Sequence, residues 1–339
     1  MNKQLTIWQL IHKSLIQNIP VMLLYVLESK GSSPGRQGFF MAVTNDGEME
    51  GSIGGGIMEH KFVEMAIEKL HAAADQEGGG IRKQIHDKSA ARNQSGMICS
   101  GEQTNFLYRM QPGDIISIEK LMRCLAENGK GLLELSTHTF SFSENVNAFE
   151  NFHFEFQSEE RWSYKEIIGF KNTIFIIGGG HCALALSKIM SMMDFYIILY
   201  DTRSDLNTMM INEYAHRKHI INNYSELEEL VPSGITQYAV VMTFGYRTDE
   251  IAVKALLSKE FLYFGILGSG KKIKKLLADL GKEGFAKDQL ERIHAPVGLP
   301  INSQTPEEIA ISIAAQIIQV KNKAAKNRID PERKKIYSD

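Results

Sequence analysis

Cysteine is scarce in this sequence, which contains three among its 339 residues. Cys99, Cys124 and Cys182 lie too far apart for a CxxC motif or for a zinc site built on paired cysteines. An odd number of cysteines also does not suit a disulfide framework. The cysteine content therefore predicts a protein of a reducing compartment, and we expect it in the cytoplasm.

The sequence also lacks an excess of charge of either sign and any long apolar run. Its 38 basic and 40 acidic residues give a net charge of -2, which offers no general attraction to nucleic acid or to an anionic membrane. No apolar run reaches the length that spans a bilayer, and the N-terminal stretch is amphipathic rather than a signal peptide. We therefore expect no nucleic-acid partner and no membrane partner, and any bound anion requires a local site.

The length and the pattern of the chain predict two domains, because 339 residues exceed what one hydrophobic core usually organises. Residues 1–160 contain mixed helix and strand patterns and form the predicted N-terminal α/β domain. Residues 171–325 form the predicted second domain, and the boundary falls within residues 143–171. The segment from 141 to 169 is polar and aromatic without a sustained period.

Strand and helix patterns alternate regularly in the second domain. Apolar runs end near residues 177, 200, 244 and 267, and helical patterns lie between them. Such alternation with short connections is typical of a parallel sheet that helices cover on both faces. The sequence therefore predicts a Rossmann-like, doubly wound domain. Its last helix begins at Thr305, where Pro306 and Glu308 complete a capping pattern.

A glycine-rich turn joins the first strand and the first helix of this second domain. Gly178, Gly180 and Ala183 occupy the glycine and small-residue positions of a G-x-G-x-x-G/A fingerprint, which holds a pyrophosphate at a helix N-terminus. Asp201 ends the next apolar run, where an acid normally bonds a ribose hydroxyl. The pattern predicts a nucleotide phosphate site. A glycine turn that serves packing alone is the other interpretation.

The residues that hydride transfer needs are not evident. Tyr214 and Lys218 have the Y-x-x-x-K spacing of a short-chain dehydrogenase, but they directly follow the second strand, whereas that pair lies much further from the glycine turn. We interpret the match as chance. A plain dehydrogenase is therefore not the first expectation for this Rossmann-like domain.

A second glycine turn, residues 51–56, joins a strand to a helix in the first domain. Gly54, Gly55 and Gly56 leave successive N–H groups unshielded, which is how anion nests are formed, and Ser52 adds a hydroxyl. No Lys-Ser or Lys-Thr follows, so the turn is not a P-loop. A phosphate site and a purely structural turn both remain open.

Each cysteine has its own context. Cys99 lies among small residues before a strand, where a thiolate serves as a nucleophile or a soft-metal ligand, and a half-buried packing cysteine is the alternative. Cys124 has helical spacing with Leu121 and Leu125, which predicts a core position. Cys182 lies in the glycine turn, where we expect the helix dipole to lower its pKa.

Taken together, these motifs resemble the xanthine dehydrogenase accessory family, XdhC/CoxI, over nearly the whole chain and in order. The matching segments are Gly31-Ser-Ser-Pro34, Gly51-Ser-Ile-Gly-Gly-Gly56 with Glu59, Gly96-Met-Ile-Cys99, Gly178-Gly-Gly-His181, Asp201-Thr-Arg203, Met242-Thr243, Asp249-Glu250, Gly265-Ile-Leu-Gly-Ser269, Ile293-His-Ala-Pro-Val-Gly-Leu299 and Thr305-Pro-Glu-Glu308. The chain departs from the family pattern at Ser100, where glycine is common, and at Phe244 and Tyr246, where histidines often stand. These departures remove side chains that could act as metal ligands.

The resemblance implies a chaperone that binds molybdenum cofactor, or molybdopterin, and delivers it to a molybdenum hydroxylase such as xanthine dehydrogenase. It also implies cofactor sulfuration with a cysteine desulfurase as a partner, and an accessory factor rather than a catalyst. A cleft between two domains would shield the cofactor from water. The implied cofactor-binding residues are Ser52, Gly54, Gly55, Gly56, Cys99, Gly178, Gly180, His181, Asp201, Ser269 and His294, with Cys99 as a molybdenum contact.

Two of these residues have a plain structural interpretation as well. His294 contacts cofactor or partner, or it stabilises its own loop by a hydrogen bond. Ser269 with Lys271 binds a second anion, or it only begins a solvated helix.

Two other functions compete with the cofactor chaperone. The first is an NAD(P)-dependent oxidoreductase, in which Asp201 favours NAD over NADP. The second is an interaction protein whose nucleotide site is a relic. The sequence leaves a monomer and a homodimer both open.

Overall fold

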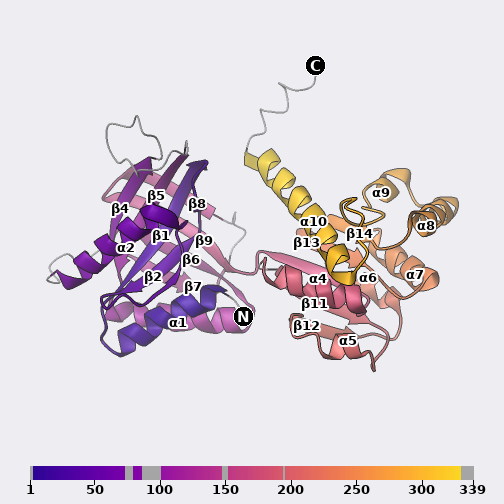
Figure 1. Ribbon diagram of the computed structural model, residues 1–339, viewed down its shortest axis with the longest axis horizontal. Coiled ribbons are helices and arrows are strands. Elements are labelled where there is room, and N and C mark those ends of the chain that lie inside the picture. The colour runs from indigo at the N-terminus through magenta and orange to yellow at the C-terminus, as the bar shows by residue number, and fades with distance from the viewer. Residues whose placement is uncertain (1–2, 73–78, 86–100, 147–151, 194, 330–339) are drawn as a thin grey trace, which may run out of the picture. The chain divides into compact units, whose positions relative to one another are not determined.

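The computed structural model describes residues 3–72, 79–85, 101–146, 152–193 and 195–329 (Figure 1). The chain divides into two compact units, Met1–Gly169 and Phe170–Asp339. Strand β9 (Arg161–Gly169) lies in the first unit, so that unit continues past residue 160, where the sequence analysis ended the first domain.

The first unit contains two antiparallel sheets. The five-stranded sheet has the order β3-β2-β1-β5-β4, and the four-stranded sheet has the order β7-β6-β9-β8. The strands are β1 (Val21–Gly31), β2 (Phe40–Thr44), β3 (Met49–Gly51), β4 (Gly79–Ile85), β5 (Gly101–Arg109), β6 (Lys130–Ser136), β7 (Phe140–Ser143), β8 (Phe152–Ser158) and β9.

Three helices complete the first unit: α1 (Lys3–Ile16), α2 (Gly56–His71) and α3 (Ile115–Ala126), the last preceded by the short turn η1 (Pro112–Asp114). Trp8 of α1 is fully buried, and its ring centroid lies 5.0 Å from Phe40 and 5.5 Å from Phe140. These two rings belong to different sheets, so Trp8 helps to join both sheets into one core. Helix α2 packs Met58 and Phe62 on the other face of the five-stranded sheet.

The second unit contains one sheet of five parallel strands in the order β12-β11-β10-β13-β14. The strands are β10 (Asn172–Ile177), β11 (Phe195–Asp201), β12 (Arg217–Ile220), β13 (Gly234–Val241) and β14 (Phe261–Ile266). The chain order reverses between β10 and β13, which makes their carboxyl ends the topological switch point of a Rossmann fold. This confirms the predicted fold class.

Helices cover both faces of the parallel sheet (Figure 1). Ile174 and Ile176 of β10 pack with α4 (His181–Ser191) and α10 (Pro306–Ile329). Phe175 and Ile177 point to the opposite face and pack with the core formed by the other large helices. The remaining elements are α5 (Asn207–Met210), η2 (Tyr224–Glu226), α6 (Leu227–Leu230), α7 (Tyr246–Leu256), α8 (Gly270–Lys282) and α9 (Lys287–Glu291).

The segment from 141 to 169, in which the sequence shows no sustained period, contains two strands that follow β7, namely β8 and β9. In β9 the inward positions include Glu166 among aromatic neighbours, which breaks the apolar alternation. Its Oε2 accepts hydrogen bonds from the Tyr25 hydroxyl at 2.6 Å and the Tyr164 hydroxyl at 2.8 Å. Within the described residues, no helix is long and apolar enough to cross a bilayer.

We expect Trp8→Ala to lower the free energy of unfolding by about 3–5 kcal/mol, because it leaves a cavity where the two sheets of the first unit meet. Ile16→Ala is the matched control on the same helix, since Ile16 is 59% exposed, and it should change stability by less than about 0.5 kcal/mol. Urea unfolding of both variants measures the difference. Equal stabilities would contradict the role of Trp8.

Candidate functional site

The turn at residues 178–180 lies between β10 and α4, at the switch point of the parallel sheet. Gly178 adopts a φ of 110°, and a Cβ atom there would lie 2.4 Å from the carbonyl oxygen of Met242. Its N–H donates to the carbonyl of Tyr200 at 2.7 Å. Backbone conformation and close approach together therefore require glycine at this position.

Asp201 lies beneath this turn and is fully buried. Its Oδ2 accepts from the Gly179 N–H at 2.7 Å and from Arg203 Nη2 at 2.7 Å. Its Oδ1 accepts from the Arg203 N–H and from Arg203 Nε, both at 2.9 Å. Four hydrogen bonds fill the acceptor sites of a carboxylate. The ribose contact predicted for Asp201 therefore has no free acceptor in this structure.

The pair of Asp201 and Arg203 is electrostatically coupled. Burial alone would raise the pKa of Asp201, but hydrogen bonds from Arg203 and Gly179 hold it below its ordinary value. The Arg203 guanidinium also lies over the Phe244 ring, 4.8 Å from its centroid. Arg203 thus connects the loop after β11 with the loop after β13, across the carboxyl edge of the sheet.

The N-terminus of α4 is what the turn leaves available for an anion. The Gly179 N–H is engaged by Asp201, whereas the first N–H groups of a helix have no partner within the helix. A Cβ atom at Gly180 would meet nothing within 4 Å, and the following residue, His181, is exposed. Gly180 and His181 therefore border open space at a positive helix end.

The loop after β13 contains a second buried carboxylate, Asp249, which is fully buried. Its Oδ1 accepts from the Thr243 N–H at 3.1 Å and the Thr243 hydroxyl at 2.5 Å, and its Oδ2 pairs with Lys272 of α8. The Ser269 hydroxyl accepts from the Lys272 N–H at 3.4 Å, so Ser269 is the N-cap of α8. The structure therefore gives Ser269 a structural role.

His294 lies beside β14. Its N–H donates to the Phe264 carbonyl at 2.8 Å, and its own carbonyl accepts from the Ile266 N–H at 3.0 Å. The imidazole stacks on Tyr263 with centroids 4.6 Å apart, and burial lowers its pKa. The backbone hydrogen bonds support the loop-stabilising interpretation, and His294 also extends the parallel sheet by one bridge to Gly265.

In the first unit, the turn at residues 51–56 is filled by the carboxylate of Glu59. Its Oε2 accepts from the Ser52 hydroxyl at 2.6 Å, the Ile53 N–H at 2.8 Å and the Gly55 N–H at 3.0 Å. Burial opposes ionisation, yet these hydrogen bonds lower the pKa of Glu59. The predicted anion nest therefore already holds an anion that the chain itself supplies.

The sequence motifs of the first unit meet on one face of the five-stranded sheet. Gln103 of β5 accepts from the Ser33 hydroxyl at 2.7 Å and donates to the Ile53 carbonyl at 3.0 Å. A Cβ atom at Gly54 would lie 2.4 Å from the Gly35 nitrogen, so the 31–35 and 51–56 segments pack backbone to backbone. Cys99 lies outside the described residues, and β5 begins two positions later at Gly101.

Polar side chains accompany Gln103 on this face. Ser29 and Gln84 lie opposite it on the two neighbouring strands, and Asn105 follows two positions along β5. We call these four residues the β5 polar cluster. Within the described part of the chain, Ser29 Oγ, Gln84 Oε1 and Asn105 Nδ2 are shielded from solvent without a hydrogen-bond partner. Each such atom costs about 1–3 kcal/mol, so the cluster is suited to a polar ligand.

The sequence analysis missed this cluster, although a signal was present. Gln103 and Asn105 alternate with Thr104 and Phe106, and Leu107 continues the face of Gln103 into the apolar core under α2. Polar residues at alternate, inward positions of a strand indicate either a buried network or a ligand.

The two described cysteines are not activated. Burial and then the nearby carboxylates raise the pKa of Cys124 to about 11, and it lies in the core as predicted. Burial, and then Glu307, raise the pKa of Cys182, so the predicted lowering by the helix dipole is wrong. Among the residues that the structure describes, no three His, Cys, Asp or Glu side chains gather as a metal site.

Lys218 does not form a proton relay with Tyr214. Its ammonium donates to the carbonyls of Met209 at 3.1 Å and Met210 at 3.0 Å. The Tyr214 ring instead lies near the Lys188 ammonium, which is 6.0 Å from the ring centroid. The chance interpretation of this spacing therefore agrees with the structure.

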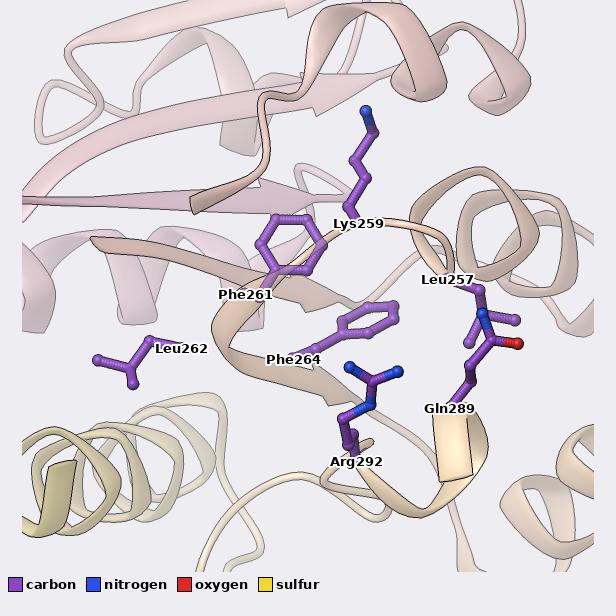
Figure 2. Close-up of a pocket in the computed structure, with 7 residues that line it drawn as sticks. All are labelled: Leu257, Lys259, Phe261, Leu262, Phe264, Gln289 and Arg292. Carbon is purple, nitrogen blue, oxygen red and sulfur yellow. The ribbon is translucent and has the colours of Figure 1, made fainter. Parts of the chain in front are cut away.

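Two cavities lie in the second unit. The larger, of about 530 Å³, follows one side of α4. The smaller, of about 200 Å³, is lined by Phe261, Phe264 and Arg292 among others (Figure 2). Phe261 begins β14, so the smaller cavity lies toward the amino ends of the strands, away from the 178–180 turn. Rossmann ligands bind at the carboxyl ends, which favours the α4 side.

The geometry defines a Rossmann-type protein with a preceding antiparallel α/β unit, and similarity to known proteins gives its family. The XdhC Rossmann domain matches residues 174–317, and the XdhC and CoxI family matches residues 15–78. Each match lies within one of the two units. The chain belongs to the XdhC and CoxI family.

Individual relatives extend this result. YqeB, an uncharacterised protein of Escherichia coli K12, is 25% identical over 312 residues, which are 91% of this chain and 45% of that protein. A Bacillus subtilis 168 protein, named as the A chain of a probable xanthine dehydrogenase, is 38% identical over 87 residues, 26% of this chain and 24% of that one. The chain therefore spans less than half the length of the curated relatives it matches.

A solved structure shares the fold. The crystal structure described as a xanthine dehydrogenase from Bacillus halodurans has a TM-score of 0.68 and 21% identity to this chain. The similarity covers 93% of this chain and 96% of that chain. At this level of identity the likeness concerns architecture, and it supports the order of an N-terminal α/β unit followed by a Rossmann unit.

We expect Gly178→Ala to lower the free energy of unfolding by roughly 3 kcal/mol, because alanine disfavours a positive φ and its Cβ would meet the Met242 carbonyl. Gly180→Ala is the matched control two positions away, and it should cost less than about 1 kcal/mol. Chemical denaturation of both variants measures the contrast. Similar losses for the two would argue against the strained turn.

We expect Asp201→Asn to lower the free energy of unfolding by about 2 kcal/mol at pH 7. The folded pKa of Asp201 is depressed, so its contribution is present above the unfolded pKa of about 3.9 and is lost as the pH falls through the folded pKa. The gap between variant and wild type should therefore shrink in acid. Asp205→Asn, at an exposed neighbour, is the control, and a gap independent of pH would contradict this account.

Proposed function

We propose that this protein is an accessory factor that binds molybdenum cofactor and delivers it to a xanthine dehydrogenase-type molybdenum hydroxylase. Membership of the XdhC and CoxI family supports an accessory role, as do the names of the B. subtilis and B. halodurans relatives. When bound, the cofactor supplies a phosphate, a pterin ring and a dithiolene-held metal.

The observation that carries the proposal is the open N-terminus of α4 at the switch point. The N–H groups after Gly180 and the helix dipole suit the phosphate of molybdopterin. Asp201 fixes the turn from below, and Gly180 leaves its outer side open. The ligand is therefore held by backbone groups, and no side chain among the described residues of this turn is placed for catalysis.

The first unit offers a set of groups that fits the pterin. The edge of a pterin presents N–H donors beside nitrogen and oxygen acceptors and is neutral at physiological pH. The β5 polar cluster presents one donor, Asn105 Nδ2, one acceptor, Gln84 Oε1, and the Ser29 hydroxyl, which does both. These atoms are neutral, so the cluster suits a neutral hydrogen-bonding edge.

The family resemblance extends the proposal to sulfuration. Cys99 is the thiol proposed for contact with molybdenum, and a cysteine desulfurase is the proposed source of sulfur. Neither Cys182 nor Cys124 competes for this role, because burial raises the pKa of both thiols.

The NAD(P)-dependent oxidoreductase has less support. Asp201 has no free acceptor for a ribose hydroxyl, and Lys218 is engaged by backbone carbonyls. The glycine turn that both functions share does not distinguish them.

The test is anaerobic titration of the protein with molybdopterin, followed by transfer to a cofactor-free hydroxylase. We expect near-stoichiometric binding by wild type. Gly180→Val should weaken binding at least about tenfold, because a branched side chain would cover the helix N-terminus without disturbing the fold.

Gly113→Val is the control, since Gly113 also has open space around it and lies in the first unit. Asn105→Leu should weaken binding as well, by removing the Asn105 Nδ2 donor of the β5 polar cluster. Absence of binding by wild type would refute the proposed function, and a thermal shift with NAD or NADP would then favour the oxidoreductase.

A further inference from the structure

A cavity of about 530 Å³ runs along the side of α4, and we call it the α4 cavity. Its length follows from the helix, because His181 lies at the N-terminal end and Met192 just past the C-terminal end. Residues after α5 form one wall, and Pro306 and Glu307 in the first turn of α10 form another. The volume lies within the usual range for small-molecule sites, about 300–1,000 Å³.

The walls of the α4 cavity are suited to a flat, partly polar ring. Leu184 and Ile189 supply apolar surface, and Tyr214 supplies an aromatic ring. The Lys188 ammonium lies 6.0 Å from the centroid of that ring. A planar ligand can therefore pack between aliphatic side chains and an aromatic face, as heterocycles do in proteins.

Two carboxylates, Glu213 and Glu307, line the same cavity. A carboxylate accepts hydrogen bonds and offers no donor when ionised, so it attracts an amino group and repels a carbonyl oxygen. The anion-binding feature beside them is the α4 N-terminus, since His181 belongs both to the first turn of α4 and to the cavity wall. A ligand can thus place a phosphate at the helix end and a ring in the cavity.

We propose that the α4 cavity binds the base of a nucleoside phosphate and selects bases that carry an exocyclic amino group. As a site for free nucleotide this stands on the cavity alone. As a site for part of the cargo it rests on the proposed function, and it then means that the protein accepts a nucleotide-bearing form of the cofactor.

Calorimetric titration of the full chain with matched nucleotides tests the selectivity. CMP should bind at least about tenfold tighter than UMP, because the two differ at one position, where an amino group replaces a carbonyl. AMP should exceed IMP for the same reason. The double variant Glu213→Gln with Glu307→Gln should bring both ratios close to one, since an amide donates as well as accepts.

A filling variant tests the location. Leu184→Trp should weaken CMP binding at least about tenfold by occupying the cavity. Ile311→Trp is the control, because Ile311 is exposed on α10 and does not line the cavity. If Leu184→Trp binds CMP like wild type, or if wild type binds UMP as tightly as CMP, the inference is overturned.

Two further arms separate this inference from the proposed function. Binding of molybdopterin by a wild type that binds no nucleotide would refute the α4 cavity and leave the accessory role intact. Binding of CMP without molybdopterin would refute the accessory role and support a free nucleotide as the ligand. Tighter binding of a nucleotide-bearing cofactor than of molybdopterin, lost in Leu184→Trp, would support the cavity as a site for the cargo.

Discussion

Backbone N–H groups in sharp turns must find acceptors, and in this protein three carboxylates provide them. Glu59 accepts from Ile53 and Gly55 in the first unit. Asp201 accepts from Gly179 and Asp249 from Thr243 in the second. Because an unpaired buried N–H costs as much as a lost hydrogen bond, these loops keep their conformations only while the carboxylates remain ionised and in place. Each turn is thereby rigid before any ligand arrives.

This arrangement changes what the glycine turns can do. A nest of N–H groups is commonly an anion site, yet a nest that already holds Glu59 has no capacity for a phosphate. In the Rossmann unit the internal carboxylate engages one N–H and leaves the helix start open. The same device therefore closes one turn and prepares the other. Arg203 balances the charge of Asp201, so that the turn does not repel an incoming anion.

Much of the Rossmann unit could be predicted from the sequence, because each of its features is local. Gly178 and Ala183 reveal the turn by spacing, and Asp201 ends an apolar strand. The direction in which Asp201 points could not be predicted, since a carboxylate at a strand end reaches solvent or turns inward according to its neighbours. Strand β9 escaped for a related reason, because Glu166 is buried with two tyrosine hydroxyls, one of them from a residue far away in the sequence.

The bridge between His294 and Gly265 has a consequence for how copies of the chain can associate. Unpaired sheet edges are templates for aggregation, and native proteins cover or shorten them. The His294 segment covers the outer side of β14, and at the other edge β12 is four residues long and begins with Arg217 and Lys218. Neither edge of the parallel sheet invites strand addition, so a self-assembly that involves this unit would have to form through helices and loops.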